Sequence, residues 1–178
     1  TIQQAINAAA TGQVIVITNT SEYDETVVIN KSITLTSNTS IRPTVSSRNA
    51  ALTAINITAD NVTVSKLHLV YNASSGSNTF GTINSAGGRF NITISNNTIN
   101  KTGSRDVHGI SFSNTNVSLI ELNNVNVTGG SADIYDISLS SGASDNTIFN
   151  NTLFINKTGT ARSLGMSSAN RNNISFNN

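Results

Sequence analysis

A short pattern of apolar residues recurs along the whole chain at an interval of about 27 residues. The first alternating pair of each interval falls at Val27/Ile29, Ile55/Ile57, Ile83, Ile110/Phe112, Ile137/Leu139 and Leu164/Met166. The second falls at Ile33/Leu35, Val62/Val64, Ile92/Ile94, Ile120/Leu122, Ile148 and Ile174/Phe176, and a third at Leu69, Ile99, Val125/Val127 and Leu153/Ile155. Repetition at a fixed period is typical of folds that stack one structural unit on the next.

Each interval therefore contains three short alternating segments that are rich in β-branched residues, which indicates strands rather than helices. If one interval forms one turn of a coil, successive turns stack about 4.8 Å apart by parallel main-chain pairing. The pattern predicts an all-β fold, a parallel β-helix of about six turns with three strands per turn. A β-sandwich of hairpins is the alternative, but its tight turns favour Asn-Gly or Asp-Gly, and the sequence contains neither dipeptide.

The two ends of the predicted coil differ. Apolar residues recur at helical spacing at Ile2, Ala5, Ile6 and Ala9. Thr1 and Gln4 have the spacing of a capping box, and Gly12 can end a helix, so we expect an amphipathic helix over residues 1–12 that covers the first turn. The other end stops inside a strand motif at 175–178. We expect residues 1–178 to be a single β-helix domain that forms part of a longer chain, or whose last turn is covered by another domain or molecule.

The composition describes the surface of such a coil. Asn, Ser and Thr make up 76 of 178 residues, whereas charged residues are 11% and the net charge is +1. Without a basic run, the chain lacks the electrostatic footprint of a nucleic-acid binder. No apolar stretch approaches the roughly 18 residues of a membrane span, so we expect no membrane insertion in this segment. No cofactor is expected, and with no cysteine, disulfides and thiolate metal sites are excluded.

Three segments carry a family resemblance: TIQQAINAA at 1–9, VIVI at 14–17 and ETVVINKSITL at 25–35. They resemble the first turns of pectin-lyase-like right-handed parallel β-helix proteins. With its Asn- and Thr-rich turns, the chain is most similar to the adhesin-like cell-surface proteins of methanogenic archaea. The resemblance implies a right-handed coil, an extracellular location at the cell surface, and a polysaccharide or cell-surface glycan as partner. The pectin-lyase-like class also includes lyases, hydrolases and epimerases.

Polar residues gather just before the first strand of each turn. Two residues before it the column reads Thr53, Gly81, His108, Tyr135 and Arg162, and four before it reads Thr79, Asp106, Asp133 and Thr160. In an enzyme, Asp106 and Asp133 would raise each other's proton affinity, His108 or Tyr135 would move a proton, and Arg162 would hold a uronate. Further ligand-binding candidates are Arg105, Asp136 and Tyr71. Alternatively, Asp106 and Asp133 share a Ca²⁺ ion with loop carbonyls, or all these residues are solvated loop ends that the repeat aligns.

Other polar residues have plainer interpretations. His68, between Leu67 and Leu69, is interpreted as a surface or hydrogen-bonded histidine, and Arg42 and Arg48 as solvated loop charges. The Asn-x-Ser/Thr triplet, an acceptor for N-glycosylation, occurs fourteen times, and stacked asparagine corners explain part of this number. The exposed candidates for glycosylation are Asn72, Asn100 and Asn156.

The sequence favours a non-catalytic module of an exported cell-surface protein that acts as a rigid stalk and an adhesive surface. Short uncharged side chains arrayed along a stiff coil suit that function. The alternative is a polysaccharide-processing enzyme that acts on uronate-containing polysaccharide through the column at Asp106, His108, Asp133, Tyr135 and Arg162. A second alternative is a self-assembling wall subunit whose last turn stacks on further repeats or on a neighbouring copy.

Overall fold

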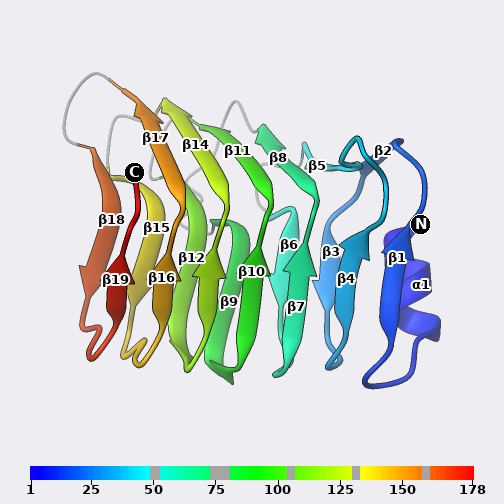
Figure 1. The fold of residues 1–178 in the computed structure, drawn as a ribbon, viewed down its shortest axis with the longest axis horizontal. Helices are drawn as coiled ribbons and strands as arrows, with labels where there is room; N and C mark the ends of the chain where they lie inside the picture. Colours follow the sequence, from blue (N-terminus) through cyan, green and yellow to red (C-terminus); the bar gives the residue numbers. More distant parts are fainter. Residues whose placement is uncertain (49–52, 73–80, 104–106, 130–132, 158–160) are drawn as a thin grey trace.

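The computed structural model describes residues 1–48, 53–72, 81–103, 107–129, 133–157 and 161–178. These residues form a parallel β-helix whose turns follow one another along a single axis, with the N- and C-termini at opposite ends (Figure 1). Each turn contributes one strand to each of three sheets, named A, B and C here. The coil is right-handed, as the family resemblance implies. Every strand pairing between turns is parallel.

Sheet A lies in front in Figure 1 and contains β1 (Val14–Ile17), β4 (Thr34–Ser37), β7 (Val62–Ser65), β10 (Ile92–Ser95), β13 (Leu119–Glu121), β16 (Thr147–Phe149) and β19 (Asn173–Ser175). Sheet B contains β2 (Glu22–Asp24), β5 (Thr44–Ser47), β8 (His68–Asn72), β11 (Thr98–Gly103), β14 (Asn124–Gly129) and β17 (Thr152–Asn156). Sheet C contains β3 (Val27–Ile29), β6 (Ile55–Ile57), β9 (Gly81–Phe90), β12 (Val107–Asn116), β15 (Ile134–Ser140) and β18 (Arg162–Ser167). Sheets B and C have six strands each, so the first and last strand of each sheet are separated by five turns of the coil. The coil is thus slightly shorter than the six turns expected.

The core is a set of apolar columns, because equivalent residues on successive turns face inward at the same place. In sheet A one such column runs through Leu35, Val64, Ile94, Ile120 and Ile148. All five side chains are fully buried. The three predicted sets of apolar segments thus correspond to the three sheets, which confirms the repeat as the basis of the fold.

The first turn is covered by helix α1 (Ile2–Ala8), which buries Ile2 and Ile6. The predicted capping box is present, with Thr1 as the N-cap and Gln4 closing it. The helix ends at Ala8, four residues before Gly12, because the chain becomes extended at Ala9. The helix is also tied to the coil, since the Lys31 ammonium donates hydrogen bonds to the carbonyls of Ile6, Asn7 and Ala9 at its C-terminal end.

Asparagines, all buried except the half-buried Asn177 in the last turn, form a ladder along the corner between sheets A and B. Its rungs are Asn97, Asn123, Asn151 and Asn177. The Oδ1 of each rung accepts hydrogen bonds from the backbone N–H and the side-chain amide of the rung before it, at 2.9 to 3.1 Å. The ladder satisfies backbone groups where the strands stop pairing.

The corner residue before this ladder adopts a left-handed conformation on successive turns. Positive φ values of 50 to 58° occur at Lys66, Asn96, Leu122, Asn150 and Phe176. The prediction that Leu122 and Phe176 face inward is therefore wrong: they are 50% and 80% exposed. The strands of sheet A before them, β13 and β19, are only three residues long, so the chain turns before a second inward position is reached.

A second column of residues with left-handed backbone conformation lies just before the strands of sheet A, and it includes a valine, which is poorly suited to that conformation. Val117 has φ +50 and is 63% exposed, whereas Asn61 and Asn91 hold the same conformation two turns and one turn earlier. A β-branched side chain is strained there, and asparagine tolerates this region. We expect Val117→Asn to raise the free energy of unfolding by about 1 kcal/mol in urea titrations. Val14→Asn, at an exposed extended position, should give no such gain, and equal effects would contradict the explanation.

Candidate functional site

The outer face of sheet C carries three of the predicted site residues in one column. Strand register places His108 beside Tyr135 and Tyr135 beside Arg162, each one turn from the next. The rings of His108 and Tyr135 lie 5.2 Å apart at 59°, and Arg162 Nη1 donates to the Tyr135 hydroxyl at 3.4 Å. His108 and Tyr135 are half-buried, and Arg162 is exposed. The structure therefore brings these three side chains together, as predicted.

A small pocket of about 300 Å³ opens beside this column, between β15 and β18, and Tyr135, Arg162 and Gly165 are among the residues that line it. Gly165 provides the space for the aromatic ring, because a Cβ atom there would come within 2.4 Å of Tyr135 Cδ1. Asp133 is exposed just before β15, and its carbonyl accepts a hydrogen bond from the Val107 N–H.

Asp106, the other member of the predicted acidic pair, and the ligand-binding candidate Arg105 lie outside the described residues. The proposed pairing of Asp106 with Asp133, in acid catalysis or around Ca²⁺, stays a prediction. Within the described ranges, no three His, Asp or Glu side chains come together in the way a metal centre requires.

Asp136 does not lie on the outer face, and its interpretation as a ligand-binding residue there is wrong. Its side chain is 0% exposed. It follows Tyr135 as Gly109 follows His108 one turn earlier, where a Cβ atom would touch the core residues Val125 and Val127. The strict alternation of buried and exposed residues breaks at this point of sheet C, because Asp136 and Ile137 are both buried.

Burial raises the pKa of the Asp136 carboxyl to about 7, against a smaller opposing effect of the Ser163 hydroxyl. Neither carboxylate oxygen has a hydrogen bond of normal geometry among the described residues. An ionised carboxylate is therefore poorly accommodated at this place in the core.

Tyr71 is also placed inside the coil and is not a surface ligand-binding residue, because it is only 2% exposed. Its ring contacts Lys101, the next residue in its column, whose Nζ lies 4.5 Å from the ring centroid. Lys101 is itself 2% exposed, and burial lowers its pKa to about 7. Tyr71 therefore shields a buried amine rather than contacting a ligand.

The three glycosylation candidates differ in their surroundings. Asn72 and Asn156 lie at the ends of β8 and β17 and are exposed, as predicted. Asn100 is half-buried, and its side-chain amide donates to His68 Nε2 at 2.9 Å. The nitrogen that a glycan would modify is thus already bonded at Asn100, and Asn72 and Asn156 are the better candidates. Glycosylation itself stays a prediction.

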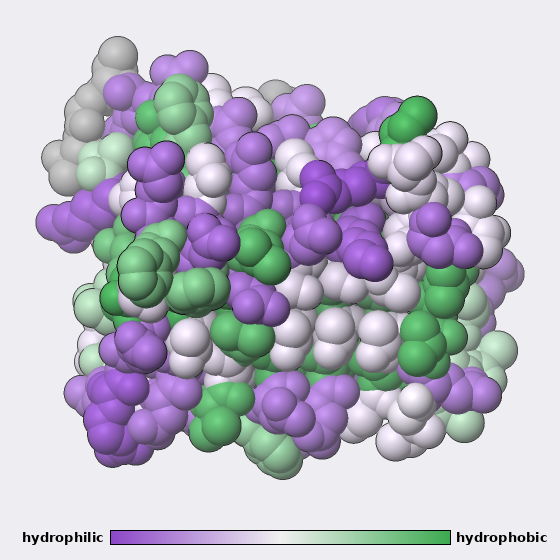
Figure 2. All heavy atoms as spheres, in the orientation of Figure 1, coloured by the Kyte–Doolittle hydropathy of each residue, from purple (hydrophilic) through white to green (hydrophobic). Residues whose placement is uncertain are grey.

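The outer face of sheet A displays two rows of short uncharged side chains. Thr34, Thr63 and Thr93 form one row, and Thr36, Ser65 and Ser95 the other, on β4, β7 and β10. In Figure 2, pale side chains of intermediate hydropathy form regular rows over these three strands. Neighbouring strands under a row are one turn apart, about 4.8 Å, and the two rows are separated by two residues along each strand. Within the second row, the Ser65 hydroxyl donates to the Thr36 hydroxyl at 2.9 Å.

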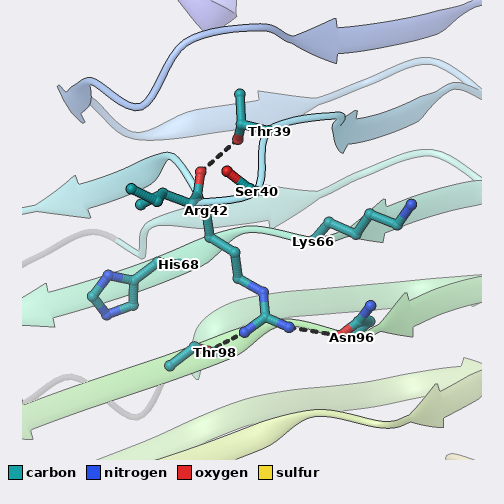
Figure 3. A pocket seen from close by; sticks show the side chains of 8 residues that line it. Thr39, Ser40, Arg42, Lys66, His68, Asn96 and Thr98 are labelled. Atoms are coloured by element: carbon teal, nitrogen blue, oxygen red, sulfur yellow. Dashed lines mark hydrogen bonds between the residues drawn. The ribbon is translucent and has the colours of Figure 1, made fainter.

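A groove of about 780 Å³ borders the second row, at the corner between sheets A and B. The loop 39–42 forms one side, and Lys66, His68, Asn96 and Thr98 line the rest (Figure 3). Arg42 extends from this loop across one turn, donating from Nη1 to Thr98 Oγ1 at 2.8 Å and from Nη2 to Asn96 Oδ1 at 2.6 Å. The guanidinium is therefore held in place, and the interpretation of Arg42 as a solvated loop charge is wrong.

His68 forms part of the same groove and is half-buried. Nδ1 lies 3.2 Å from the Thr44 hydroxyl, and Nε2 accepts the Asn100 amide, so the neutral ring has a partner at each nitrogen. Burial, and then the nearby charge of Arg42, lower the pKa of His68, while Glu22 opposes this. The prediction of a hydrogen-bonded histidine is confirmed. Arg48 is exposed and pairs with Glu22 and Asp24.

The groove was not predicted from the sequence because its parts come from three turns. Arg42 reaches residues 54 and 56 positions further along the chain. A loop between strands has no fixed place in the repeat, so the period does not indicate where its side chains lie. The one available signal was that Arg42, Lys66 and His68 all come after the second apolar segment of a turn.

No family model and no curated protein matches this sequence. Among solved structures, an alginate lyase from Paenibacillus sp. str. FPU-7 is similar, with a TM-score of 0.44 and 12% identity, covering 97% of this chain and 91% of that chain. Over the residues that the structure describes, no helix is long and apolar enough to cross a bilayer.

Proposed function

We propose that this chain is a non-catalytic module of an extracellular, adhesin-like cell-surface protein, with a glycan-binding surface on sheet A and the adjoining groove. The observation that carries the proposal is the pair of hydroxyl rows at Thr34, Thr63 and Thr93 and at Thr36, Ser65 and Ser95. A polysaccharide also presents the same groups at a regular interval. Matched repeats allow the same weak hydrogen bonds to form on each successive turn, and such contacts add along the chain.

The chemistry of the rows suits sugars. Serine and threonine hydroxyls both donate and accept hydrogen bonds, as sugar hydroxyls do. The side chains are short and are held on a rigid sheet, so little conformational entropy is lost when a ligand orders them. A stack of hydrogen-bonded turns is also stiff along its axis, as a stalk requires.

The proposal is tested by removing hydroxyls without changing shape. We expect the double variant Thr63→Val/Thr93→Val to bind a retained polysaccharide about tenfold more weakly in calorimetry, because two hydrogen bonds are lost. Thr147→Val is the matched control, since Thr147 lies on the same face but beyond Leu119, which interrupts the row. A polysaccharide panel with no ligand, or equal losses in both variants, would contradict the proposal.

The alternative function is a polysaccharide-processing enzyme, and the stacked His108, Tyr135 and Arg162 side chains favour it. There Arg162 would hold a uronate carboxylate, and Tyr135 or His108 would move the proton at the reacting carbon. This function requires new chain ends to appear when the protein is incubated with uronate polymers, and requires Tyr135→Phe to abolish them. Binding without product formation would exclude it.

A further inference from the structure

We infer that the groove between sheets A and B is a subsite for an oxyanion substituent, a carboxylate or a sulfate ester, on the glycan that the module binds. This inference rests on the proposed function, because it concerns the same ligand. It also assigns a role to Arg42 and Lys66, which have no place in the sheet C column.

The charge of the groove is the first argument. Arg42, Lys66 and His68 are among its lining residues, and no aspartate or glutamate is. Glu22, the acidic residue that influences His68, is engaged with Arg48 at 3.0 Å and with Ser46 at 2.9 Å. Two permanent positive charges therefore face a concave surface without a neutralising carboxylate among the residues that line it, in a chain with only ten lysines and arginines.

The geometry of Arg42 is the second argument. The guanidinium has five N–H donors, and Asn96 and Thr98 take two of them. The remaining three donors have no acceptor among the described residues. Figure 3 shows the Arg42 side chain running across the floor of the groove, between the loop and the strands below. A fixed guanidinium with free donors needs little reorganisation to bind an oxyanion through two hydrogen bonds.

The uncharged hydroxyls of the glycan have partners beside this charge. The hydroxyl row at Thr36, Ser65 and Ser95 runs along the border of the groove. Lys66 and Asn96, which line the groove, directly follow Ser65 and Ser95 in the sequence. A sugar chain that lies along the rows would place a charged substituent over Arg42 and Lys66 without leaving sheet A. Partial burial of the groove weakens solvent screening of this contact relative to an open surface.

The test compares two polymer pairs: a uronate polysaccharide with its carboxyl-reduced form, and a sulfated polysaccharide with its desulfated form. We expect the wild-type protein to bind at least one charged polymer about tenfold more tightly than its neutral form, as fits charge-assisted hydrogen bonds. Whichever pair shows the difference identifies the oxyanion. Equal affinity for charged and neutral forms in both pairs would overturn the inference but leave the proposed function standing, whereas no binding at all would overturn both.

Variants assign the preference to the groove. Arg42→Gln should remove most of the preference for the charged polymer, and Lys66→Gln should reduce it about threefold. Lys66 is exposed, and its side-chain ammonium has no hydrogen bond to another described residue, so its substitution tests the charge even if Arg42→Gln impairs folding. Arg48→Gln removes a positive charge outside the groove and is the matched control. A loss from Arg48→Gln equal to that from Lys66→Gln would contradict the assignment.

Discussion

Asn123→Leu is expected to lower the free energy of unfolding by about 4 kcal/mol, because it removes a central rung of the buried ladder. Asn123 Oδ1 accepts from the backbone and side-chain nitrogens of Asn97, and Nδ2 donates to the Ile94 carbonyl at 2.8 Å. Leucine has a similar volume but forms none of these bonds. The Asn97 N–H and the Ile94 carbonyl would stay buried without partners, at about 1 to 3 kcal/mol each.

Urea unfolding of the two proteins measures this loss, and amide exchange at Asn97 shows where it arises. Asn124→Leu is the matched control, since Asn124 is the adjacent residue, is exposed, and faces outward on β14. The control should change stability by less than about 0.5 kcal/mol. A loss below about 1 kcal/mol for Asn123→Leu would mean that the ladder contributes little to the stability of the coil.

Asp136→Asn is expected to stabilise the protein at pH 8 by as much as about 4 kcal/mol and to have little effect at pH 4. The folded-state pKa of Asp136 is raised to about 7, whereas its ordinary value is 3.8. Between these values the folded protein holds a proton that the unfolded chain has released. Its contribution to stability is therefore fully present below about pH 4 and is lost as pH rises through 7. Asparagine does not ionise, so the variant should not show this loss.

Thermal or urea unfolding of wild type and variant from pH 4 to pH 8 measures the effect. The pKa of Lys101 is lowered to about 7, so its contribution increases stability as pH rises above 7, but Lys101 is present in both proteins and this contribution cancels in their difference. Asp145→Asn is the control: Asp145 is exposed and pairs with Arg171 at 2.6 Å, which lowers the pKa of its carboxyl. Parallel pH profiles for wild type and Asp136→Asn would contradict the placement of Asp136 in the core.

The repeat was sufficient to predict the sheets, because stacking forces equivalent residues into columns. Ile94, Ile120 and Ile148 could be aligned by counting alone. The capping box of α1 was likewise readable, since it depends on only two residues, Thr1 and Gln4, at a fixed spacing.

Counting along the 27-residue period was insufficient wherever the alternation of inward and outward residues is interrupted. Asp136 was expected to be a ligand-binding residue beside the polar column, but Asp136 and Ile137 are both buried. Leu122 was expected inside, but it follows a strand of three residues and occupies the turn. The column of His108, Tyr135 and Arg162 on sheet C could be predicted because it follows the period. The groove could not, because it depends on the Arg42 side chain, which extends from a loop across one turn.

The central claim is that the module binds polysaccharide on sheet A and its groove without cleaving it. It is tested most directly by incubating the protein with a panel of uronate-containing and sulfated polysaccharides and measuring retention and new chain ends in the same samples. We expect retention of at least one polymer, weakened by Thr63→Val/Thr93→Val and by Arg42→Gln, with no new ends. New ends that disappear in Tyr135→Phe, or the absence of any retained polymer, would contradict the account.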